Sequence, residues 1–63
     1  MIYTFNGYRK TAHQMMGLLG IERWYKIIEE ASKVEDRNNY HTMVTVYGNV
    51  YEVVIYWNKF YVE

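Results

Sequence analysis

The chain has 63 residues, which leaves room for one domain, residues 1–63, that buries only about 60% of its unfolded surface. It contains no cysteine, and this excludes a disulfide framework and a thiolate metal site. Seven basic and seven acidic residues cancel, so no net charge draws the chain onto nucleic acid or an anionic membrane.

The first expected element is a short strand at residues 2–5, where aromatic and β-branched residues precede the turn pair Asn6-Gly7. Residues 8–10 then form a small basic exit from that turn. We expect the strand to flank a larger sheet made by the C-terminal half. No segment has the layout of a signal peptide or approaches the roughly 20 apolar residues of a membrane span, so we expect a cytoplasmic protein.

A short helix is expected to follow Thr11 and to run to about Leu19. Thr11 and Gln14 have the spacing of a capping box, in which each side chain bonds the backbone N–H of the other residue. Gly20 follows as a C-terminal stop, because glycine readily adopts the conformation that ends many helices. The apolar stripe of this helix consists of Ala12, Met15, Met16 and Leu19.

Residues 21–34 have the clearest helical pattern in the chain, with an apolar stripe that should cover the sheet. The members of this stripe are Ile21, Trp24, Ile27, Ile28, Ala31 and Val34. On the outer face, Glu22 precedes Lys26 and Glu29 precedes Lys33 by four residues, the favourable order for helical ion pairs. A polar loop is expected at residues 35–39.

Residues 40–62 are rich in β-branched and aromatic residues and predict a three-stranded meander. Gly48-Asn49 has glycine first, as a type II′ turn requires, and this turn would pair Val44 with Val53. A second turn at Asn58-Lys59 would pair Ile55 with Val62. The chain is therefore expected to be an α+β domain of order β-α-α-β-β-β, whose small antiparallel sheet packs on one main helix.

Side chains alternate across a sheet, so this register divides the meander into two faces. The face expected to meet the helix is almost wholly apolar and consists of Tyr40, Thr42, Val44, Val46, Tyr51, Val53, Ile55, Trp57, Phe60 and Val62. The outer face consists of His41, Met43, Thr45, Tyr47, Val50, Glu52, Val54, Tyr56, Tyr61 and Glu63. A solvent face is usually more polar than this second set.

Residues 11–21, Thr-Ala-His-Gln-Met-Met-Gly-Leu-Leu-Gly-Ile, with the helix and hairpin that follow, resemble the helix-turn-helix of winged excisionase-type and MerR-type DNA binders. In those proteins a first helix ends at Leu-Gly-Ile and a recognition helix follows. The resemblance implies an alternative function, DNA binding through Arg9, Lys10, Arg23, Lys26 and Lys33. Charge argues against it, because the expected wing at residues 40–57 holds Glu52 and no basic residue to neutralise phosphates.

We expect no enzyme, no cofactor and no metal site. His13 and His41 lack the HxxH or HxxxH spacing of paired metal ligands. Glu52, expected opposite Thr45 and on the same face as His41 and Tyr56, belongs to the one cluster of titratable groups, and such clusters are usually hydrated sheet surface. Stacking of single-stranded nucleic acid on the outer tyrosines would need interleaved basic residues, and only Lys59 lies nearby.

Protein binding is the function that the composition favours. Eight tyrosines and two tryptophans exceed what so small a core can hide, and tyrosine is enriched at interfaces. The expected contact residues on the outer sheet face are Met43, Tyr47, Glu52, Tyr56 and Tyr61. In size, aromatic content and lack of catalytic motifs the chain is similar to small phage-encoded inhibitors, such as anti-CRISPR proteins, that block a host or defence protein. The expected partner is a protein, and the sequence is compatible with a homodimer.

Overall fold

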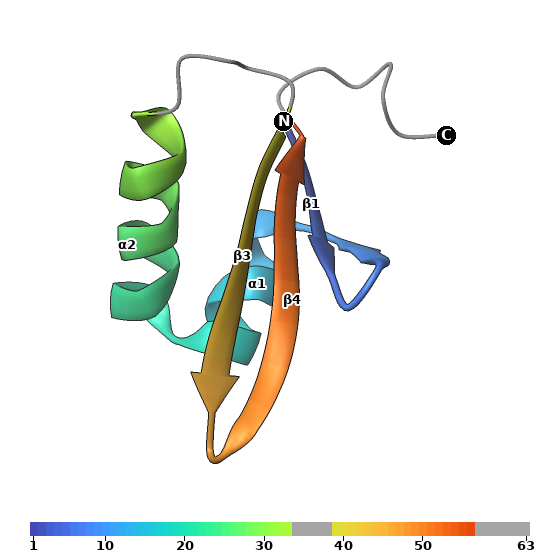
Figure 1. Cartoon of the computed structure of the whole chain (residues 1–63), viewed down its shortest axis with the longest axis vertical. Coiled ribbons are helices and arrows are strands. Elements are labelled where there is room, and N and C mark those ends of the chain that lie inside the picture. The colour runs from blue at the N-terminus through green and yellow to red at the C-terminus, as the bar shows by residue number, and fades with distance from the viewer. Residues whose placement is uncertain (34–38, 57–63) are drawn as a thin grey trace.

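The computed structural model describes residues 1–33 and 39–56 (Figure 1). In this part of the chain, one four-stranded antiparallel sheet packs against two helices, which confirms the predicted α+β class. The strand order across the sheet is β2-β1-β4-β3. The elements in chain order are β1 Ile2–Phe5, β2 Tyr8–Lys10, α1 Ala12–Leu19, α2 Ile21–Ser32, β3 Asn39–Val46 and β4 Asn49–Tyr56.

The N-terminal residues form a hairpin rather than a single strand with a basic exit. Asn6 and Gly7 both have positive φ, 51° and 83°, and this turn lets β2 pair back along β1. On its other side β1 pairs with β4, with Ile2 opposite Tyr56. The place beside β4 that the third meander strand was expected to take is therefore held by β1. Residues 57–63, which include Trp57 and Tyr61, lie outside the described residues.

The β3–β4 hairpin turns one residue earlier than the sequence predicts. Tyr47 and Gly48 occupy the turn with φ values of 50° and 81°, as in a type I′ turn, and Asn49 belongs to β4. Val44 consequently pairs with Tyr51 instead of Val53, so the predicted register was wrong by two residues. Two residues is the repeat of a strand, so every side chain of the hairpin keeps its predicted face.

Both helices begin and end near their predicted positions. Thr11 Oγ1 accepts a bond from the Gln14 N–H at 3.1 Å, and Gln14 Oε1 accepts one from the Thr11 N–H at 2.8 Å, which confirms the capping box. Gly20, at φ 89°, is the one residue between α1 and α2. At the end of α2, Lys33 pairs with Glu30 at 3.2 Å and not with the predicted Glu29.

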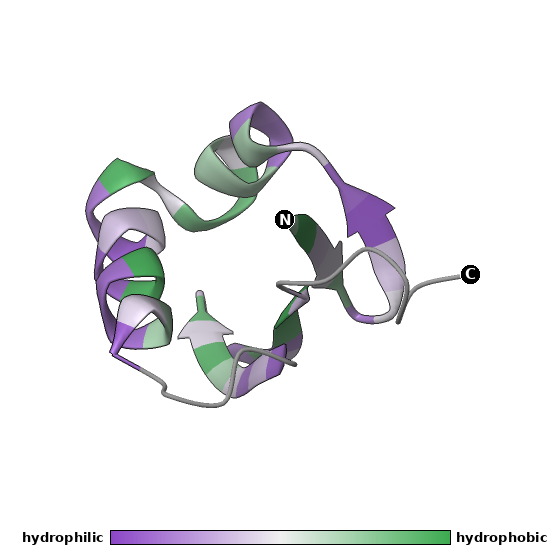
Figure 2. Cartoon of the chain, turned by 90° about the horizontal axis from the view of Figure 1, so that it is seen from above, coloured by the Kyte–Doolittle hydropathy of each residue, from purple (hydrophilic) through white to green (hydrophobic). Residues whose placement is uncertain are grey.

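The core lies between the helices and the inner face of the sheet. Seen from above, the sheet curves around both helices, which lie on the same side of it (Figure 2). The buried core residues are Met15, Leu19, Trp24, Ile27, Ala31, Val44, Val53 and Ile55. Tyr3 meets Trp24 edge to face with ring centroids 4.9 Å apart, which ties β1 to α2. Ile21 was expected in this core, but it is exposed.

Candidate protein-interaction surfaces

The outer face of the sheet, turned away from the helices, is buried at one end. Thr4 lies opposite Val54 in the ladder between β1 and β4, and both side chains are buried, as is Ile2. Tyr56, an expected contact residue, lies opposite Ile2 at this end and is half-buried. No local pattern indicated this neighbourhood, because it depends on β1 entering the sheet beside β4.

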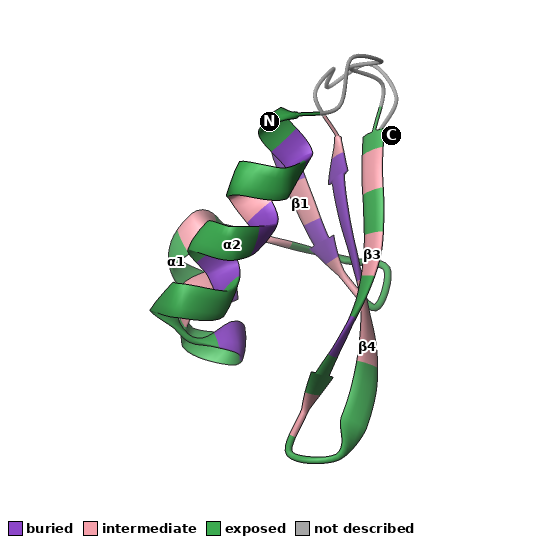
Figure 3. Cartoon of the chain, turned by 60° about the vertical axis from the view of Figure 1, so that its left-hand side comes forward, coloured by how far each residue is buried: buried purple, intermediate pink, exposed green. Residues whose placement is uncertain are grey.

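The turn end of the hairpin carries three exposed apolar or aromatic residues, which we call the hairpin patch: Met43 and Val50 on the outer face of the strands, and Tyr47 in the turn itself. Met43 is 57% exposed, Val50 60% and Tyr47 99%. Thr45 lies opposite Val50, and Met43 is two residues along from Thr45, so Met43 and Val50 are diagonal neighbours on one face. Figure 3 shows the turn end of the hairpin as exposed and extending beyond the helices.

Glu52 borders the hairpin patch through a polar network. It lies opposite Met43 rather than the expected Thr45, and its Oε2 is 2.8 Å from His41 Nε2. The Glu52 N–H donates to Asn6 Oδ1, and the Glu52 carbonyl accepts from the Asn6 N–H, both at 2.8 Å. Because the side chains of His41 and Glu52 are both about half exposed, we expect their contact to contribute only about 0–1 kcal/mol.

Two of the five predicted contact residues, Met43 and Tyr47, therefore lie in the hairpin patch, and Glu52 lies at its border. Tyr56 is at the far end of the sheet, and Tyr61 lies outside the described residues. Val50 was placed on the outer face by the sequence but not among the contact residues. Val50 is exposed because it lies near the tip of the hairpin, two residues after the turn pair Tyr47-Gly48.

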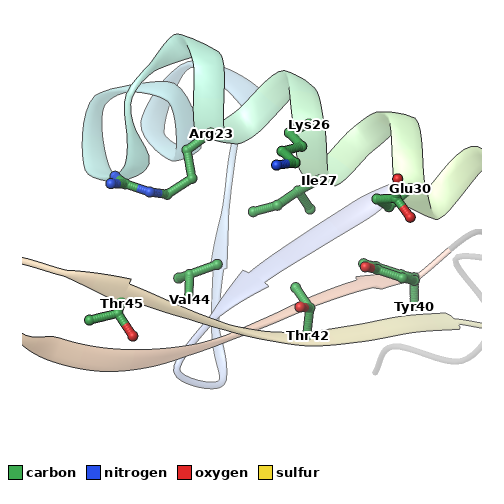
Figure 4. Close-up of a pocket in the computed structure, with 8 residues that line it drawn as sticks. All are labelled: Arg23, Lys26, Ile27, Glu30, Tyr40, Thr42, Val44 and Thr45. Atoms are coloured by element: carbon green, nitrogen blue, oxygen red, sulfur yellow. The ribbon is translucent and has the colours of Figure 1, made fainter.

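A groove of about 260 Å³ separates α2 from β3, on the inner side of the sheet. Ile27 and Val44 provide apolar surface, and Figure 4 shows Arg23 and Lys26 along one part of its helical wall and Glu30 above Tyr40 at the other end. No sequence pattern indicated this groove. It depends on how far α2 stands from the edge of the sheet, which is a matter of tertiary packing.

The basic residues of the DNA-binding alternative do not form one surface. Arg9 and Lys10 lie on β2, at the opposite edge of the sheet from β3. Arg23 and Lys26 line the groove, and Arg23 Nη1 donates to the Leu19 carbonyl at 2.6 Å. Lys33 is paired with Glu30.

Within residues 1–33 and 39–56, no group of three or more His, Cys, Asp or Glu side chains is placed to hold a metal ion. His13 lies on α1, on a different element from His41 on β3. The described helices include none with the length and apolar character needed to cross a membrane. No protein-family model, curated protein or solved structure matches the chain.

Proposed function

We propose that the chain is a non-enzymatic protein-binding module that contacts its partner through the hairpin patch and blocks that partner by steric occlusion. The observation that carries this proposal is Tyr47. Its side chain is 99% exposed, and its backbone has φ 50°, a conformation that costs a residue with a Cβ about 1–2 kcal/mol.

Because the Tyr47 side chain is 99% exposed, it gains almost no burial energy from the described residues to offset this conformational cost. Asparagine before glycine is the preferred pair for a turn with two positive φ values, and it would form the same hairpin at lower energy. A large aromatic side chain at the tip of a projecting hairpin gains energy only if a partner buries it. Tyrosine suits this role because it offers a rigid apolar ring with a polar end at a small entropic cost.

Met43 and Val50 add exposed apolar surface on the strands that lead to and from the Tyr47 turn, and the contact of His41 with Glu52 gives the patch a polar border. An apolar centre with a polar rim is the usual arrangement of a protein interface. The proposal keeps the resemblance in type to small phage-encoded inhibitors of host or defence proteins and the cytoplasmic location that the sequence suggests. DNA binding stays a prediction, with weaker support because its basic residues are divided among separate surfaces.

The test is a capture experiment from host lysate with the intact chain and two matched variants. Tyr47→Asn removes the exposed ring from the patch and keeps a good turn. Tyr25→Asn removes an exposed ring from α2, away from the patch. We expect the wild type and the Tyr25 variant to retain the same protein, identified by mass spectrometry, and the Tyr47 variant to lose it. Equal retention by all three chains would contradict the proposal.

A further inference from the structure

The edge of the sheet formed by β3 is eight residues long and has no neighbouring strand among residues 1–33 and 39–56. In the described part of the chain β3 pairs with β4 alone, whereas the opposite edge is the three-residue strand β2. Natural edge strands are commonly protected by lysine, proline or a bulge. Residues 39–46, Asn-Tyr-His-Thr-Met-Val-Thr-Val, include no proline and no Lys, Arg, Asp or Glu, and each residue has one partner in β4.

The register shows which backbone groups face outward from this edge. Glu52 directs both its N–H and its carbonyl to Asn6, on the β1 side. Its cross-strand partner Met43 is therefore in a non-hydrogen-bonded pair, in which the backbone groups of both residues point away from each other. By alternation, the N–H and C=O groups of His41, Met43 and Thr45 point out from the edge.

The helix α2 forms a wall over this edge. The groove between α2 and β3 places Ile27 on the wall and Thr42 and Val44 on the floor. A strand added beside β3 would direct alternate side chains into this groove. Figure 4 shows Arg23 over Val44 and Thr45, near the end of β3, and Lys26 beside Ile27, above Thr42, so the basic groups lie between the middle of the groove and the end of β3.

We propose that β3 accepts an extended segment of a partner protein as an additional antiparallel strand beneath α2. Its N-terminal residue is acidic and lies nearest Arg23, with Lys26 farther along the same wall, because an antiparallel segment begins where β3 ends. Aliphatic residues at alternate positions of the segment enter the groove and pack between Ile27 on α2 and Val44 on β3. The proposal rests on the proposed function only in that the partner is a protein. The surface does not include Tyr47 or Val50, and from Met43 it uses the backbone groups alone.

The probe is a capped seven-residue peptide in which an aspartate precedes alternating valine and threonine. It is titrated into the ¹⁵N-labelled intact chain and followed by amide chemical shifts. We expect the largest shifts at the outward-pointing amides of His41, Met43 and Thr45 and small shifts at Thr42 and Val44, whose amides pair with β4. A peptide with its aspartate moved to the C-terminal end should bind more weakly; tighter binding would contradict the antiparallel orientation.

Backbone pairing is tested with two N-methylated forms of the same peptide. One form is methylated on the odd-numbered amides and the other on the even-numbered amides, so each blocks one edge of the probe strand. A strand added to β3 uses one edge only, and we expect one form to bind within about twofold of the parent and the other not to bind. Equal binding by both forms would overturn strand addition.

The charge contribution is tested with Lys26→Glu and with Arg9→Glu as the matched control on β2. We expect Lys26→Glu to weaken binding of the aspartate peptide roughly threefold to tenfold and Arg9→Glu to leave it unchanged. Equal affinities for the two variants would contradict the proposed position of the acidic residue. Tyr47→Asn should leave peptide binding intact, which separates a failure here from a failure of the hairpin patch.

Three results would overturn the proposal as a whole. The first is the absence of amide shifts up to millimolar peptide. The second is a set of shifts centred on Tyr47 and Val50, which would place the peptide on the hairpin patch instead. The third is a shift of the His41, Met43 and Thr45 amides with protein concentration alone, accompanied by a dimer in sedimentation, which would make a second copy of the chain the occupant of the edge.

Discussion

The two ends of the β3–β4 hairpin use the same kinds of residue for opposite purposes. At the end near β1, Val53 and Ile55 are fully buried beneath the helices. At the turn end, Val50 and Met43 are exposed, although their side chains are equally apolar. Alternation alone does not explain the difference, because the outer face is also buried at Val54. The strand β1 pairs only with residues 53–56 of β4, and the turn end of the hairpin extends beyond the helices (Figure 3), so this end is available for contact.

The largest expected effect is at the covered end. Ile55→Ala leaves a cavity beneath Trp24 and its neighbours and should lower the free energy of unfolding by about 2–5 kcal/mol, enough to unfold much of a domain this small. Urea denaturation followed by circular dichroism measures this loss. Val50→Ala is the matched control at the turn end, with an expected loss near zero. Equal losses of unfolding free energy for Ile55→Ala and Val50→Ala would show that the two ends of the hairpin contribute equally to stability, and would contradict the comparison.

A smaller effect is expected where the two ends meet. Tyr51 is half-buried and stacks on Phe5, with ring centroids 4.8 Å apart and planes 29° apart. Tyr51→Leu keeps an apolar side chain and removes the stack, so it should cost about 0.5–1.5 kcal/mol. The same denaturation experiment checks this value. A loss of unfolding free energy as large as that of Ile55→Ala would show that the core extends as far as Tyr51, toward the turn.

The smallest effect is expected at the border of the hairpin patch. Glu52→Gln removes the charged partner of His41 but keeps the side-chain length and the backbone bonds to Asn6. Because the pair is exposed, the free energy of unfolding should change by less than about 1 kcal/mol. A loss well above this value would mean that the pair supports the fold, and it would then belong with the covered end.

Features set by neighbouring residues were predicted well from the sequence. The capping box of Thr11 and Gln14 and the stop at Gly20 need only local geometry, and they occur as expected. The faces of the hairpin were also correct in spite of the wrong turn, because the error was two residues and the strand repeat is two. An error of one residue would have placed Val53 and Ile55 outside.

Features set by distant parts of the chain were not predicted. The turn is a local exception: it was missed because propensity disfavours tyrosine at positive φ, which is the property that now makes Tyr47 a candidate contact residue. The entry of β1 beside β4 joins residues 2–5 to residues 53–56, and no local pattern encodes that pairing. The groove beneath α2 likewise depends on the separation of two packed layers.

The proposed role of Tyr47 requires that it is kept at the turn at a cost to the fold. The most direct measurement is the free energy of unfolding of Tyr47→Asn against the wild type, by urea denaturation without any partner. We expect the variant to be more stable by about 1 kcal/mol, because Asn-Gly suits a turn with two positive φ values. A variant less stable than the wild type would show that the tyrosine serves the fold, and would contradict the claim.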